Sequence, residues 1–181
     1  MDNELRWDFG KPMSDLQALE LLFKGGMASD NGDSLSFEGT PWMYAEGLAA
    51  LESQLGYKVP TDIAMFLQCF GGTKLFINSY GGGTQILPIG EITSRNLALQ
   101  EADDPFWPTF AILGFSSMDD MLCMYNQDGR VHFGNLDHEA WGCSEVWASE
   151  AMTFAPFDKW LRMFIESKGG TLPGKDIAYE I

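Results

Sequence analysis

The segment from residue 45 to residue 72 constrains the fold most, because it contains the signals of two consecutive helices. The first helix is predicted to end at Gly56, since glycine readily takes the left-handed conformation that closes a helix. Its apolar residues recur at helical spacing: Ala45, Leu48, Leu51 and Leu55. The sequence therefore predicts an amphipathic helix that stops at Gly56.

A second helix is predicted directly after the first. Pro60 has the fixed φ that suits a first helical turn, and Asp62 lies where the positive end of the helix dipole favours an anion. The apolar residues that follow form a single stripe: Ile63, Phe66, Leu67 and Phe70. The glycine pair at residues 71–72 is expected to end this helix.

This arrangement resembles the core motif of the SUKH superfamily. The matching features are the pair Leu51-Glu52, then Gly56, then Pro60 and Asp62, and finally the glycine pair. Later segments follow the order that the family shows, with a strand leading to Glu91-Ile92, a set of strands, and a last helix. These later segments are residues 86–89, 110–114 and 154–161.

The resemblance covers roughly residues 42–166. The superfamily includes fungal cell-wall-synthesis regulators and many bacterial immunity proteins of toxin systems. The resemblance implies a protein that binds another protein and needs no cofactor. Residues 1–40 are either an extension of this core or its first layer, and the sequence does not decide between the two.

The sequence predicts an α+β fold in a single domain, residues 1–181, with a mostly antiparallel sheet of about six strands flanked by N- and C-terminal helices. Helices are predicted over residues 14–24, 45–55, 61–70 and 154–165, and residues 27–40 are predicted as a loop. The predicted strands are residues 74–78, 86–89, 110–115, 121–126 and 130–134. The first two of these strands are expected to pair as a hairpin over a flexible glycine-rich loop. Residues 121–125 are apolar on both alternating faces, which predicts a strand that is covered on both sides.

Composition favours a cytoplasmic protein. No run approaches the roughly 18 apolar residues of a membrane span, and the first residues lack the basic and apolar regions of a secretion signal. Cys69, Cys123 and Cys143 are an odd number of widely separated residues in apolar surroundings. They are expected to be reduced thiols in the core.

The formal net charge of −15 is concentrated in one part of the chain. Residues 101–150 contain ten acidic residues and one basic residue, and so contribute nine of the fifteen surplus negative charges. A field of this sign repels phosphate backbones, so nucleic-acid binding is not expected. The same field would steer a basic protein partner toward this part of the chain. The simpler interpretation is that the acidic residues only keep the protein soluble.

Sequence patterns for catalysis or metal binding are weak. Residues 81–84 are glycine-rich but lack the lysine and the following helix of a phosphate-binding loop. His132, His138 and Cys143 lack the spacing of a zinc site, and no motif for a nucleophile is present. We therefore predict no catalytic residue, no metal and no cofactor.

The predicted function is stoichiometric binding and neutralisation of a cognate toxin, a basic nuclease, by an acidic surface. The residues predicted to contact the partner are Asp103, Asp104, Asp119, Asp120, Asp137, Glu139 and Trp141. A regulatory adaptor that binds a client enzyme without inhibiting it is the alternative. An enzyme would require the histidines and paired acids to converge in one pocket. The sequence does not determine the partner, the mode of inhibition or the oligomeric state.

Overall fold

The computed structural model describes eight stretches of the chain: residues 28–30, 33–40, 45–80, 82–105, 107–116, 120–127, 129–136 and 156–166. Its strands are β1 (Ala28–Asp30), β2 (Asp33–Thr40), β3 (Gly72–Ile77), β4 (Thr84–Ile86), β5 (Phe110–Phe115), β6 (Met121–Gln127) and β7 (Arg130–Leu136). Its helices are α2 (Ala45–Leu55), α3 (Thr61–Phe70), α4 (Ile89–Glu101) and α6 (Phe157–Glu166). The helix predicted over residues 14–24 lies outside the described stretches.

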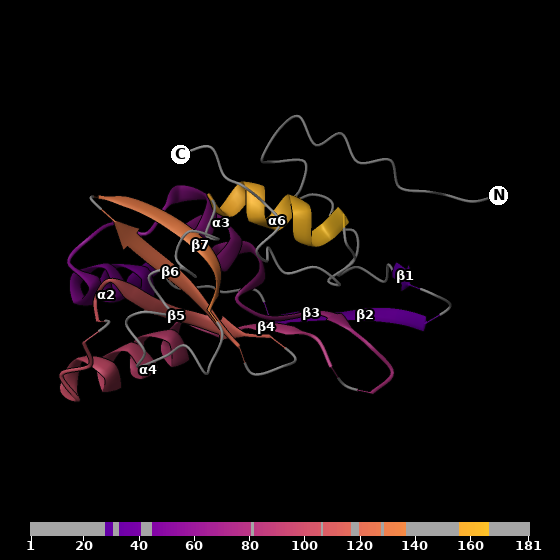
Figure 1. Cartoon of the computed structure of the whole chain (residues 1–181), viewed down its shortest axis with the longest axis horizontal. Helices are drawn as coiled ribbons and strands as arrows, with labels where there is room; N and C mark the ends of the chain where they lie inside the picture. Colours follow the sequence, from indigo (N-terminus) through magenta and orange to yellow (C-terminus); the bar gives the residue numbers. More distant parts are fainter. Residues whose placement is uncertain are drawn as a thin grey trace.

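The strands form one sheet in the order β1-β2-β3-β4-β5-β6-β7, and each neighbouring pair is antiparallel (Figure 1). Sheet order therefore equals sequence order. Helices α2 and α3 lie between β2 and β3 in the chain, and α4 lies between β4 and β5. The predicted α+β fold is confirmed, with β2 to β7 as the main sheet and β1 as a three-residue addition.

The prediction of a loop over residues 27–40 is wrong. Strands β1 and β2 pair there as an antiparallel hairpin, in which Asp30 lies opposite Asp33. The residues between the two strands are Asn31 and Gly32, the dipeptide that most strongly favours a two-residue hairpin loop. The hairpin was not predicted because the region is rich in polar residues, a composition that is typical of an irregular loop.

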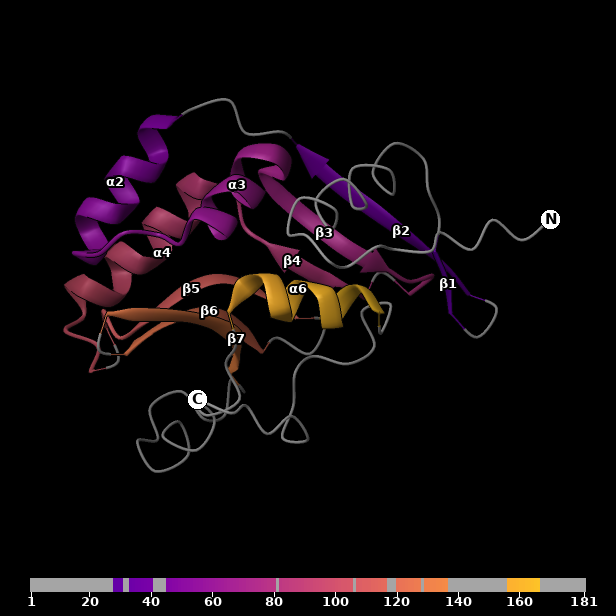
Figure 2. The same ribbon diagram turned by 90° about the horizontal axis from the view of Figure 1, so that it is seen from above.

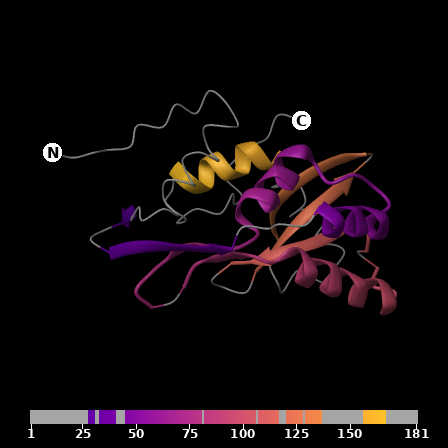
Figure 3. The ribbon, with the colours of Figure 1, turned by 180° about the vertical axis from the view of Figure 1, so that it is seen from behind.

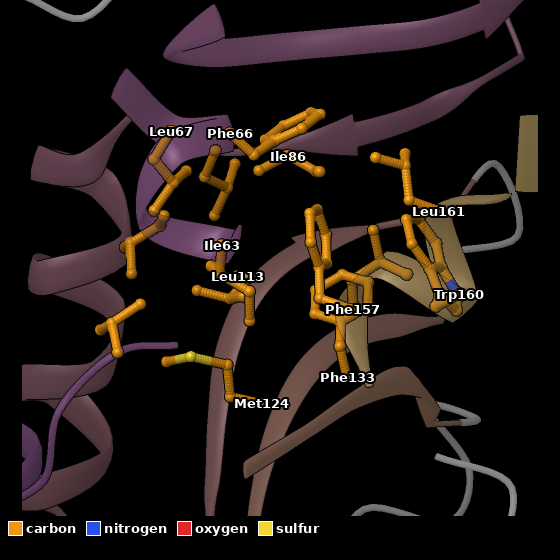
Figure 4. Close-up of a cluster of buried hydrophobic side chains, with 14 of the residues drawn as sticks. Ile63, Phe66, Leu67, Ile86, Leu113, Met124, Phe133, Phe157, Trp160 and Leu161 are labelled. Carbon is orange, nitrogen blue, oxygen red and sulfur yellow. The ribbon is translucent and has the colours of Figure 1, made fainter. Parts of the chain in front are cut away.

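The main hydrophobic core lies between the sheet and helices α3 and α6, which cover the same face (Figures 1 and 2). Figure 4 shows side chains from both helices meeting those of β5, β6 and β7. Within this core, the centre of the Trp160 ring lies 4.4 Å from that of the Phe133 ring and 4.8 Å from that of the Phe164 ring. Such aromatic pairs each add about 0.5–1.5 kcal/mol beyond the burial of their area. The last helix, predicted over residues 154–165, is α6, and these contacts bury its aromatic residues in the core.

Strand β6 is buried on both faces, as its sequence predicted. Leu122 and Met124 belong to the main core. Cys123 and Tyr125 point to the opposite face, where the Tyr125 ring stacks on Phe110 at 4.8 Å. The expectation that the cysteines are core thiols is confirmed for Cys123 and is wrong for the exposed Cys69, while Cys143 lies outside the described stretches.

The corner between α2 and α3 is held by Glu52. One oxygen of its carboxylate accepts a hydrogen bond from the Val59 backbone N–H at 3.2 Å, and the other pairs with the exposed ammonium of Lys58. Gly56 has a φ of +75°, which ends α2 and turns the chain toward α3. The Leu51-Glu52 pair therefore buries the first residue in the core and uses the second to fix the loop.

Asp62 joins the beginnings of two helices that are distant in sequence. Its carboxylate accepts hydrogen bonds from the backbone N–H of Ile63, at 2.9 Å, and from that of Asp158, at 3.2 Å. These donors lie in the first turns of α3 and α6, where backbone N–H groups lack partners inside the helix. The Asp62 side chain therefore links the first turn of α6 to that of α3.

The two glycines after α3 have different structural roles. Gly71 has a φ of +57°, and its N–H bonds to the Leu67 carbonyl at 2.9 Å, so it closes the helix. A Cβ added at Gly72 would lie 2.6 Å from Cγ of Pro88 and 2.9 Å from its backbone nitrogen. The second glycine is therefore required because β3 begins in direct contact with the segment that leads into α4.

Asn96 of α4 takes the place of a neighbouring strand along part of β5. Strand β4 ends at Ile86, so β5 lacks a strand neighbour on that side at Ile112. The Asn96 side chain, fully buried, accepts from the Ile112 N–H at 2.9 Å and donates to the Ile112 carbonyl at 2.8 Å. Both backbone groups of Ile112 are thereby satisfied by one amide.

Candidate protein-interaction surface

The connection from α4 to β5 carries two of the residues predicted to contact a partner. The N–H of Asp103 bonds to the Gln100 carbonyl at 3.2 Å, and that of Asp104 bonds to the Leu99 carbonyl at 3.0 Å. The Trp107 N–H in turn bonds to the Asp104 carbonyl at 3.1 Å. The backbone of this turn is therefore fixed, and it holds the Asp103 side chain in solvent.

The acids of this turn lie at the electrostatically unfavourable end of α4. The carboxyl end of a helix carries a partial negative charge, so a cation there stabilises the helix and an anion destabilises it. Helix α4 has no basic residue in its last turn, and Glu101 precedes Asp103 and Asp104 there. We call these three residues the acidic end of α4. Their placement increases the local negative potential at an end of the helix where the dipole favours cations.

Asp120 lies at the other end of β5. Its carbonyl accepts a hydrogen bond from the Ser116 N–H at 2.8 Å, which brackets the connection between β5 and β6. Strand β5 has six residues, so Asp120 and the acidic end of α4 are separated by roughly 20 Å along the strand. The structure therefore places these predicted contact residues beyond opposite ends of β5.

The separation is compatible with a single partner. A standard interface buries about 800 Å² on each protein, which corresponds to a patch roughly 30 Å across. The remaining predicted contact residues lie outside the described stretches: Asp119, Asp137, Glu139 and Trp141. For all seven residues, contact with a partner stays a prediction.

Burial shifts the pKa of three ionisable side chains in the direction that favours their neutral forms. Burial raises the pKa of the Cys123 thiol, and burial followed by the proximity of Cys123 raises the pKa of Tyr57. Burial, with a smaller contribution from Arg130, lowers the pKa of His132. A neutral thiol inside the sheet is a poor nucleophile.

Metal binding finds no support in the described part of the chain. Within those stretches, no group of three or more His, Cys, Asp or Glu side chains could hold a metal ion. His138 and Cys143, the other candidate ligands, lie outside them. Among the described helices, none is both long enough and apolar enough to cross a membrane.

The fold and its motif agree with a comparison against protein families. The model of the SMI1/KNR4 family (SUKH-1) matches residues 45–162, which is well over half of the chain. The chain belongs to this family. Searches of curated proteins and of solved structures returned no match.

Membership of SUKH-1 supports an immunity-type or regulatory protein in general. The matched region begins with α2 and ends within α6, so it contains the Glu52 corner, the Asp62 contacts and the glycine pair. Strands β1 and β2 precede it. The motif residues therefore fix the loop between α2 and α3, link α3 to α6 and allow β3 to begin close to Pro88.

Sequence analysis missed one exposed residue, Tyr80, in the connection between β3 and β4. It is 92% exposed, and only Leu97 accompanies it as an exposed large hydrophobic residue in the described stretches. A signal was present in the sequence, because no charged residue occurs between Lys74 and Glu91. An uncharged stretch that includes a solvent-exposed connection is unusual in a chain that is 20% charged.

Proposed function

We propose that this SUKH-1 chain is a cytoplasmic immunity-type protein that neutralises a cognate toxin, a basic nuclease, by stoichiometric complex formation. The observation that carries the proposal is the acidic end of α4 in a chain of net charge −15. The helix dipole favours cations at this end of α4, so the dipole gives no reason for acidic residues there. A positively charged partner would gain from the same potential.

The proposed mode of action requires no catalytic residue of this chain. Negative charge on a surface raises the rate at which a basic protein arrives, and buried contacts then set the lifetime of the complex. The chain would block the toxin by covering its active site. The acidic end of α4 and Asp120 are the described parts of the proposed surface.

Charge replacement at the acidic end of α4 tests this role. The variant Glu101→Lys with Asp103→Asn changes the charge there by three units. Lysine suits the end of a helix, and asparagine tolerates the positive φ of +50° at residue 103, so folding is expected to be preserved. The control is Glu38→Lys with Glu91→Gln, which changes the net charge by the same amount at exposed positions elsewhere.

The partner is first recovered with tagged wild-type protein at low salt, identified by mass spectrometry and purified. Stopped-flow measurements should then show association slowed by about tenfold or more for the α4 variant and less for the control. The difference should shrink at 1 M salt, where the Debye length is about 3 Å. Equal rates for both variants at low salt would exclude the acidic end of α4 as the steering surface.

The activity of the recovered partner distinguishes immunity from the adaptor alternative. Loss of its activity at one equivalent of this chain supports neutralisation. Full activity in the saturated complex supports a regulatory adaptor and contradicts the proposal.

A further inference from the structure

We draw no further inference here: the strongest candidate, the exposed Tyr80 in the uncharged connection between β3 and β4 (Figure 3), carries none, because nothing in the described part of the chain shows what covers it.

Discussion

Replacing Asn96 by alanine should weaken the fold more than its position on a half-exposed helix suggests. Asn96 is fully buried, and its amide satisfies both the N–H and the carbonyl of Ile112 on β5. Alanine leaves both backbone groups without these hydrogen bonds, in a region where Ile112 is 7% exposed. The substitution therefore leaves the Ile112 backbone without a hydrogen-bonding partner on this side of β5, because β4 ends at Ile86.

The magnitude follows from the number of groups left unsatisfied. A buried donor or acceptor without a partner costs about 1–3 kcal/mol, so two such groups give about 2–6 kcal/mol. Release of the buried asparagine amide offsets part of that cost, and we expect a loss near 3 kcal/mol. For a domain of this size each kcal/mol lowers Tm by about 2–4 °C, so Tm should fall by about 6–12 °C.

Urea and thermal unfolding measure the loss, and hydrogen exchange locates it. The Ile112 amide should exchange faster in Asn96→Ala than the lower global stability alone requires. Ser94→Ala is the matched control, because it removes an exposed hydrogen bond from the Ser94 hydroxyl to the Gly90 carbonyl on the same helix. It should change stability by less than about 0.5 kcal/mol. An Asn96→Ala protein as stable as this control would refute the reasoning.

Two further predictions concern the glycines and the cysteines. Gly72→Ala should destabilise the fold by about 1–3 kcal/mol because its Cβ would overlap Pro88, whereas Gly90→Ala, with nothing within 4 Å of the added Cβ, should stabilise α4 by about 0.5–1 kcal/mol. Urea unfolding of the pair checks this, and equal stabilities would contradict the packing at Gly72. Iodoacetamide should label the exposed Cys69 in the native protein and spare Cys123, whose pKa is raised by burial. Peptide mapping checks this, and labelling of both residues at the same rate would show that β6 is more accessible than its packing implies.

Local sequence signals were sufficient for α2, α3 and strands β5 to β7, whereas α4 was not among the predicted helices and the strand predicted over residues 86–89 is β4 at Thr84–Ile86. Helices α2 and α3 follow from Gly56, Pro60 and the glycine pair, because each acts through the backbone of its own segment. The apolar residues on both alternating faces of residues 121–125 also predicted a strand that is buried on both sides, and β6 is such a strand. The β1–β2 hairpin was missed although Asn31-Gly32 indicated it.

Contacts between distant segments could not be predicted in this way. Asp62 was expected only to favour the start of α3, and its second bond to the Asp158 N–H depends on where α6 lies. Asn96 was not singled out at all, since its role depends on where β4 ends. The predicted contact residues were grouped by their proximity in sequence, whereas the length of β5 separates the acidic end of α4 from Asp120.

A titration of the partner's activity tests the central claim most directly. The basic protein retained by tagged wild-type chain at low salt is purified, its nuclease activity is measured, and increasing amounts of this chain are added. The account predicts a linear fall in activity that reaches zero at one molar equivalent. Undiminished activity in a complex shown to be saturated would contradict it.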